Sequence, residues 1–204
     1  MLNLRPAVAR VAEPLAGALL RAGVSPDAVT VAGTFCAVAG ALLLFPGGQF
    51  LLGTVVVTLS VLSDALDGTM ARELARRKGP AGPWGAFLDS TMDRIADGAI
   101  FAGVALWYAG DGQSRLLVGV ALACLVLGAV TSYAKARAQS LGMTCDVGLL
   151  ERTERLILVL AGTLVTGFGV EEALPTVLWV TAVGSVVTVG QRLVEVRRQA
   201  LRAA

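Results

Sequence analysis

Four aspartates interrupt two apolar stretches of this chain in closely spaced pairs: Asp64 with Asp67, and Asp89 with Asp93. On an α-helix the first pair lies about 60° apart around the axis and the second about 40° apart, so each pair shares a face. Ionised carboxylates in an apolar segment need a partner or must be neutralised. The chain has no histidine, and its three cysteines form no CxxC pair. Any metal must therefore be held by oxygen ligands, which favours Mg²⁺ or Mn²⁺. Four carboxylates are enough for two such ions, as at a site that binds phosphate groups.

The competing interpretation is that each aspartate caps a helix or pairs with an arginine such as Arg72 or Arg94. Two neighbours of the first pair favour a ligand site instead. Gly68 lets another group approach the helix backbone closely, and Arg72, one turn later, offers a fork of donors to a phosphate oxygen. Helix packing is the alternative role of Gly68. Carboxylates, glycine and arginine together predict a site for a metal-bound diphosphate.

The elements that must carry these residues are membrane-spanning helices. The chain has 204 residues, of which 55% are hydrophobic and 16% charged, and its mean hydropathy is +0.73. This composition is too apolar for a soluble domain of this size. A spanning helix needs roughly 20 mainly apolar residues. We expect six of them, at about 28–45, 50–74, 86–109, 116–138, 151–170 and 174–193.

Residues 1–23 predict an amphipathic helix lying along the membrane surface, because Arg10, Glu13 and Pro14 interrupt any signal-peptide core. Its lipid-facing residues would be Leu4, Val8, Val11, Leu15 and Leu19. The sequence therefore predicts an all-α integral membrane protein in which a surface helix precedes six transmembrane helices. We expect a single domain over 1–204, with the six-helix bundle formed by 24–204.

The distribution of basic residues predicts the orientation in the membrane. Six spans place both termini on one side, and sixteen of the seventeen basic residues fall there, with only Arg115 opposite. By the positive-inside rule that side is cytoplasmic. All four aspartates lie at the cytoplasmic ends of their spans, so we expect a cell-membrane protein whose active site opens to the cytoplasm.

The series Asp64-x2-Asp67-Gly68-x2-Ala71-Arg72, followed by Gly85-x3-Asp89-x3-Asp93, resembles the signature of the CDP-alcohol phosphotransferases. These enzymes use a CDP-linked lipid or alcohol as donor and release CMP. The resemblance extends over nearly the whole chain, because the family shares the six spans and the amphipathic N-terminal helix.

This resemblance implies roles for the site residues. Asp64, Asp67 and Asp89 would hold two Mg²⁺ ions, or Mn²⁺, against the donor diphosphate, and Asp93 would bind one ion and act as general base. The turn "SPDAVT" (25–30) would line the nucleotide site. The same residues are typical of a helix N-terminus, with Ser25 as N-cap and Pro26 as first residue. The residues expected to bind the CDP-diacylglycerol donor are Ser25, Pro26, Asp27, Ala28, Thr30, Gly68, Ala71, Arg72 and Gly82.

Two further segments, "SYAKARAQS" (132–140) and "LLERTERLIL" (149–158), resemble the actinobacterial phosphatidylinositol phosphate synthases, which transfer a phosphatidyl group to inositol phosphate. This implies an acceptor site formed by five cations near the cytoplasmic ends of three spans: Lys135, Arg137, Arg152, Arg155 and Arg192. Positive-inside topology alone also places basic residues there. Glu151 and Glu154 are expected to pair with the arginines, and Asp97 to form a packing hydrogen bond.

The sequence therefore predicts a Mg²⁺-dependent transfer of the phosphatidyl group from CDP-diacylglycerol to inositol phosphate. One alternative is a sister transferase with another acceptor, such as a phosphatidylglycerophosphate synthase that uses glycerol 3-phosphate. A more distant one is a divalent-cation or solute transporter, which the confinement of all four aspartates to one membrane face argues against. The expected partners are both substrates, the lipid bilayer and, as in relatives, a second copy of the chain in a homodimer, with no nucleic acid.

Overall fold

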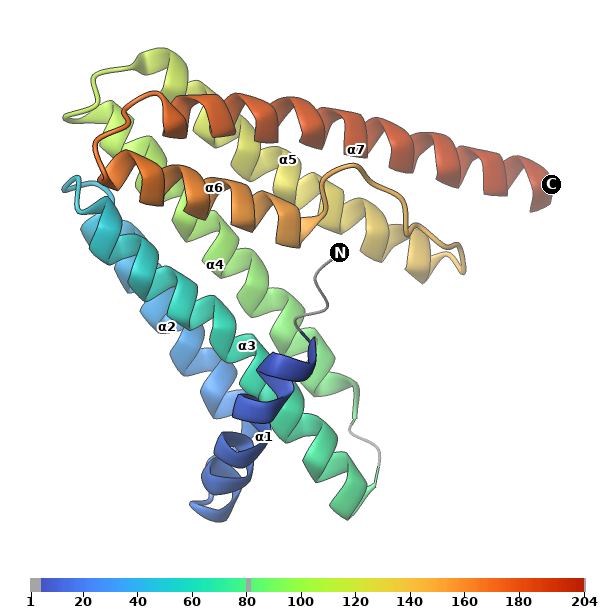
Figure 1. The fold of residues 1–204 in the computed structure, drawn as a ribbon. Coiled ribbons are helices and arrows are strands. Elements are labelled where there is room, and N and C mark those ends of the chain that lie inside the picture. The colour runs from blue at the N-terminus through green and yellow to red at the C-terminus, as the bar shows by residue number, and fades with distance from the viewer. Residues whose placement is uncertain (1–4, 80–81, 204) are drawn as a thin grey trace. The chain divides into compact units, whose positions relative to one another are not determined.

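The structure is a computed structural model that describes residues 5–79 and 82–203. Over these residues it is all-helical, which confirms the all-α part of the predicted fold class. The seven helices are α1 (Arg5–Arg21), α2 (Pro26–Leu44), α3 (Phe50–Lys78), α4 (Pro83–Ala109), α5 (Arg115–Ser140), α6 (Arg152–Gly167) and α7 (Ala173–Ala203) (Figure 1). They form two compact units. The first comprises Met1–Gly40 and Val55–Ala96, and the second comprises Ala41–Thr54 and Asp97–Ala204.

Four of the described helices are long and apolar enough to cross a membrane: α2, α3, α5 and α7. The protein is therefore a membrane protein. The other two expected spans, 86–109 and 151–170, correspond to α4 and α6, which are not among these four helices. With 16 residues, α6 is roughly 24 Å long, less than the roughly 30 Å of a bilayer core. Helix α4 carries four charged residues, Asp89, Asp93, Arg94 and Asp97.

The expected surface helix coincides with α1, which contains Pro14 and has Leu15 exposed on its surface. Leu19 is partly exposed. The predicted lipid-facing positions Leu4, Val8 and Val11 lie outside the part of the chain whose side chains the structure describes.

In the first unit, two glycines of α2 let it pack tightly against α3. A Cβ atom on Gly33 would lie 2.2 Å from Ser63 Oγ, and one on Gly40 would lie 2.7 Å from Val56 Cγ1. As residue numbers rise along α2 they fall along α3, so the two helices are antiparallel. Any larger residue at either glycine would force the helices apart, and this close approach brings the start of α2 beside the second half of α3.

In the second unit, α7 packs against both α5 and α6 (Figure 1). Close contact again depends on glycine, since a Cβ atom on Gly162 of α6 would lie 2.2 Å from Val177 Cγ2. The face of α7 inside the unit is polar as well as apolar, with Thr181, Ser185, Thr188 and Arg192 all buried. Each follows the previous one by three or four residues, so they line one stripe of the helix.

The connection between α2 and α3 is a tight turn that contributes to the second unit. Gly48 adopts φ +70° there, a left-handed conformation that favours glycine. Its amide donates to Phe45 O over 3.0 Å. Phe50 then packs edge-on against Trp107 of α4, with ring centroids 5.2 Å apart.

Candidate active site

The central contact of the predicted metal site is a hydrogen bond between α2 and α3. Thr30 Oγ1 donates to Asp67 Oδ2, and both residues are buried, with Asp67 only 6% exposed. The antiparallel packing of α2 on α3 creates this contact. Thr30 is a predicted donor-binding residue, and in the structure its hydroxyl also orients a predicted metal ligand.

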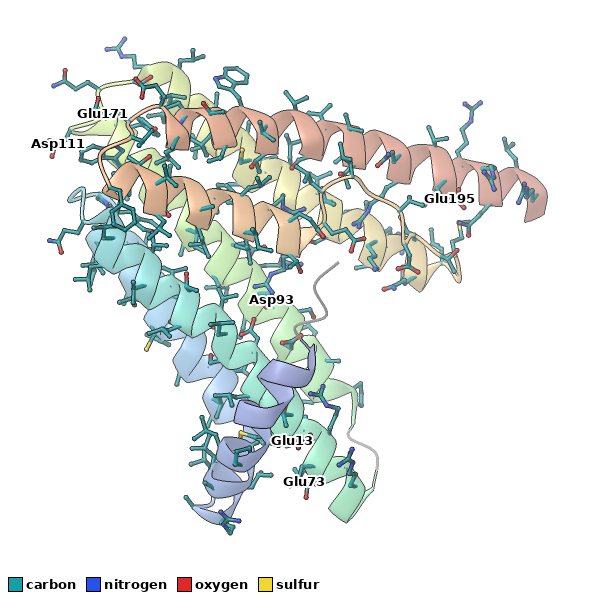
Figure 2. The ribbon with its side chains drawn as sticks, viewed as in Figure 1. Glu13, Glu73, Asp93, Asp111, Glu171 and Glu195 are labelled. Carbon is teal, nitrogen blue, oxygen red and sulfur yellow. The ribbon has the colours of Figure 1, made fainter. Side chains whose placement is uncertain are left out.

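The other three aspartates lie on the same two helices as predicted. Asp64 is partly buried on α3, and Asp89 is exposed on α4. Asp93, which is labelled in Figure 2, also lies on α4 and is partly buried. The charges of Asp89 and Asp27 both act on Asp67, so carboxylates from three helices lie within electrostatic range of one another. Asp93 Oδ2 also lies 3.6 Å from Arg94 Nη2, the arginine pairing that the competing interpretation anticipated.

The described side chains do not form a ready-made metal cage. Within the described residues, no three histidine, cysteine or acidic side chains are placed so that they could hold an ion together. Like charges repel at close range, and a divalent cation is the partner that would let the carboxylates converge. The donor set fits such an ion, because it offers only oxygen ligands, as Mg²⁺ and Mn²⁺ prefer.

The start of α2 has the geometry expected of a helix N-terminus. The helix begins at Pro26, and the amide of Ala28 donates to Ser25 Oγ over 3.2 Å, so the predicted N-cap is confirmed. Asp27, in the first turn, accepts a 2.9 Å hydrogen bond from the indole Nε1 of Trp84 on α4. Nothing in the spacing of Trp84 distinguishes it from an interfacial tryptophan, so the sequence did not predict this contact.

The remaining predicted donor residues lie on α3 and the connection that follows it. Arg72 is exposed, and its Nη2 donates to Thr69 Oγ1 over 2.9 Å. Its Nη1 lies 3.6 Å from where a Cβ atom on Gly68 would be, so the two residues share a face as expected. Ala71 is partly buried and Gly82 is exposed.

Three of the predicted acceptor cations lie near the surface of the second unit. Lys135 Nζ pairs with Asp146 Oδ1 at 2.6 Å, and Arg152 Nε pairs with Asp97 Oδ1 at 3.1 Å, the packing bond expected of Asp97. Arg137 points to its own helix end, where Nη1 donates to Ser140 Oγ over 3.2 Å. Lys135 and Arg137 therefore make different contacts, because residues two apart on a helix do not share a face.

The other two acceptor cations are buried. Arg155 is 2% exposed and donates to Leu150 O over 3.3 Å, and Arg192 is 4% exposed. Arg192 donates to Val147 O over 2.9 Å and to Thr131 O over 2.5 Å, and also pairs with Glu151 at 3.3 Å. Both arginines thus help to fix the chain that joins α5 to α6.

That connection, residues 141–151, is tied to α7 at further points. Gln199 forms two hydrogen bonds with the backbone of Thr144: its Oε1 accepts from the amide over 3.0 Å, and its Nε2 donates to the carbonyl over 2.7 Å. Thr188 Oγ1 accepts from the amide of Leu150 over 2.9 Å. No local sequence signal could have identified these anchors, since each joins residues about forty or more positions apart.

Comparison with known proteins identifies the class. The family model described as CDP-alcohol phosphatidyltransferase matches residues 23–190, a range that includes all four aspartates and four of the five acceptor cations. The chain belongs to the CDP-alcohol phosphatidyltransferase family, and it is a phosphatidyltransferase enzyme. The resemblance inferred from the motif is confirmed.

Individual relatives are similar over most of their length. The chain is 51% identical over 201 residues to the phosphatidylinositol phosphate synthase of Streptomyces avermitilis, covering 95% of this chain and 81% of that protein. It is 52% identical over 192 residues to the same enzyme of Mycobacterium marinum, covering 93% and 80%.

Two solved structures of the Mycobacterium tuberculosis phosphatidylinositol phosphate synthase also match, each at 48% identity. The one with CDP-DAG bound gives a TM-score of 0.86 and covers 92% of this chain and 94% of that one. The one in complex with manganese and citrate gives a TM-score of 0.85 and covers 91% and 88%.

Proposed function

We propose that this chain is a phosphatidylinositol phosphate synthase, which transfers the phosphatidyl group of CDP-diacylglycerol to inositol phosphate and releases CMP. The observation that carries the acceptor assignment is the basic cluster of the second unit. Lys135, Arg152, Arg155 and Arg192 come from α5, α6 and α7 and are held by defined contacts. Binding a phosphate requires several cations in fixed positions. The positive-inside rule requires only that cations lie on the cytoplasmic side of the membrane.

In the proposed reaction, a hydroxyl oxygen of inositol phosphate attacks the β-phosphorus of CDP-diacylglycerol. The bond from that phosphorus to the bridging oxygen breaks, and CMP leaves with the electron pair. Asp93 accepts the hydroxyl proton as general base, which is the role that the family resemblance implies for it. Arg94 lies where it can limit the motion of that carboxylate.

A divalent metal fits the donor residues of the first unit. Asp64, Asp67, Asp89 and Asp93 would hold it, with two Mg²⁺ ions as the family resemblance implies, and a relative has been solved with manganese. When bound, the metal offsets charge on the β-phosphorus and on the leaving CMP. Thr30 orients Asp67 for this role from α2.

The nucleotide end of the donor is assigned to the start of α2 and the middle of α3. A helix N-terminus favours phosphate because its first amides point outward, and α2 begins at Pro26 directly after the Ser25 cap. Asp27 and Ala28 complete this turn. Gly68 leaves the backbone of α3 open, Ala71 keeps the neighbouring surface small, and Arg72 supplies a forked donor beside them. Gly82, which is exposed, contributes from the position directly before α4.

The remaining features of the enzyme follow from the family and the sequence pattern. We place α4 and α6 in the membrane with the four apolar helices, giving six spans with α1 on the surface and both termini in the cytoplasm at the cell membrane. The family model extends across residues of both units, which supports a single catalytic domain. A homodimer is part of this proposal, because the family resemblance implies one.

A panel of acceptors tests the proposal. The purified enzyme, with Mg²⁺ and CDP-diacylglycerol, should release CMP rapidly with inositol phosphate and slowly with free inositol or glycerol 3-phosphate. Free inositol has no phosphate for the basic cluster to bind, and glycerol 3-phosphate lacks the ring of hydroxyls. Faster turnover of glycerol 3-phosphate would make the chain a phosphatidylglycerophosphate synthase, and faster turnover of free inositol would refute the role of the cluster.

A further inference from the structure

Lys135 and Asp146 form a close ion pair in the second unit, with Nζ and Oδ1 2.6 Å apart. It is also accessible: the side chain of Lys135 is 35% exposed and that of Asp146 is 70% exposed. Asp146 stands in the connection between α5 and α6, eleven positions after the lysine. An anion that binds Lys135 from solution therefore has to compete with this carboxylate for the ammonium group.

The backbone on both sides of Asp146 is fixed by α7. Gln199 holds Thr144 through its two hydrogen bonds, and Arg192 holds the carbonyl of Val147. The charge of Arg192 also acts on Asp146. The carboxylate is thus presented to two of the proposed acceptor cations by an anchored segment, so its position beside Lys135 does not depend on the lysine alone.

We propose that Asp146 is an internal counter-ion of the acceptor site, which the phosphate of inositol phosphate must displace from Lys135 before it can bind fully. This inference rests on the proposed function, because it takes Lys135 to be a phosphate ligand. The other ion pairs of the cluster are less suited to such an exchange. Arg192 is almost fully buried against Glu151, and both side chains of the Arg152–Asp97 pair are mostly buried.

The charge state of Asp146 supports the competition. The hydrogen bond from Lys135, together with the positive charges of Lys135 and Arg192, holds the pKa of Asp146 below its usual value. The carboxylate is therefore ionised at neutral pH. It both occupies a donor of Lys135 and repels an approaching phosphate, so it weakens acceptor binding and favours acceptors with enough further contacts to compensate.

Replacing Asp146 with asparagine tests the inference in the full-length enzyme. Asp146→Asn keeps the size of the side chain and an oxygen that accepts from Lys135, but removes the charge. The KM for inositol phosphate should fall about two- to fivefold, the range expected for an exposed ion pair, with kcat and the KM for CDP-diacylglycerol unchanged. Inorganic phosphate, used as a competitive inhibitor, should inhibit more strongly by a similar factor. Asp111→Asn, at an exposed aspartate between α4 and α5, is the matched control and should change neither constant.

Lys135→Ala, alone and combined with Asp146→Asn, separates this inference from the proposed function. If Lys135→Ala raises the KM for inositol phosphate and Asp146→Asn does not lower it, Asp146 is no counter-ion and the proposed acceptor site stands. If Asp146→Asn lowers the KM equally in the Lys135→Ala background, its effect does not pass through the lysine and the inference is wrong. If Lys135→Ala leaves the KM unchanged, Lys135 is not a phosphate ligand and the inference is wrong, whereas the other acceptor cations are tested separately by Arg152→Ala.

Discussion

The hydrogen bond from Thr30 to Asp67 offers a direct test of how the first unit orients a proposed metal ligand. Thr30→Val replaces the hydroxyl with a methyl group of similar size, so the packing of α2 on α3 is kept while the donor is lost. The Thr30 hydroxyl has a single proton and two acceptors in reach, Asp67 and Pro26 O, the latter at 3.2 Å. Thr30→Ser retains the donor and should restore function.

The magnitude follows from the burial of both partners. A hydrogen bond to an ionised group contributes about 1.5–3 kcal/mol, and because Asp67 is only 6% exposed, water has little access to replace the lost donor. The carboxylate then loses its fixed orientation while the charges of Asp89 and Asp27 still act on it. We expect metal affinity to fall roughly ten- to a hundredfold, the range found when a residue that orients a metal ligand is removed.

Two measurements check this expectation. Mn²⁺ binding to the purified protein, followed by its paramagnetic resonance signal, reports affinity directly, and the Mg²⁺ concentration that gives half-maximal CMP release reports it through activity. Both should shift in Thr30→Val and recover in Thr30→Ser. Thr34→Val, one helical turn further along α2, is the matched control and should shift neither. If Thr30→Val binds Mn²⁺ as tightly as the unaltered protein, Thr30 only packs the helices, and if it binds more tightly, the hydroxyl competes with the metal.

Three further changes test other parts of the molecule. Asp93→Asn should abolish CMP release while leaving CDP-diacylglycerol binding, measured by calorimetry, largely intact, because the general base is lost; near-normal turnover would remove Asp93 from the mechanism. Arg152→Ala should raise the KM for inositol phosphate roughly ten- to a hundredfold with little change for the donor, and an unchanged KM would reduce this arginine to a partner of Asp97. Gly103→Ala should lower the thermal unfolding temperature, because its Cβ would lie 2.3 Å from the carbonyl oxygen of Ala41 and overpacking of this kind costs about 1–3 kcal/mol; Gly98→Ala on the same helix, with open space around its Cβ, is the control, and equal melting of the two variants would contradict the argument.

The features that could be predicted from the sequence are those set by local pattern. The composition and the lengths of the apolar stretches predicted an all-α membrane protein, and the positions of the aspartates assigned them correctly to two helices. The N-cap at Ser25 was readable because serine before proline has a specific local geometry. The family motif added roles to these positions, since its residues are fixed in order and spacing.

The features that could not be predicted depend on which helix packs where. The contact of Thr30 with Asp67 joins residues 37 positions apart and requires the register of α2 on α3, which Gly33 and Gly40 set through contacts that the sequence does not reveal. The same holds for Gln199, whose amide reaches Thr144 across 55 positions. A glutamine near the end of a basic helix has no local feature that distinguishes it from a solvated residue.

The basic cluster shows why charge alone could not separate topology from function. The positive-inside rule requires only that cations remain on one side of the membrane, and exposed side chains such as Arg137 satisfy it at little cost. Burying a cation is costly unless hydrogen bonds compensate it, and Arg192 makes such bonds to Val147 O and Thr131 O. Topology gives no reason to accept that cost at Arg192 or Arg155. Their burial is explained if they fix the α5–α6 connection, and with it Lys135 and Asp146, in the arrangement that an anionic acceptor would meet.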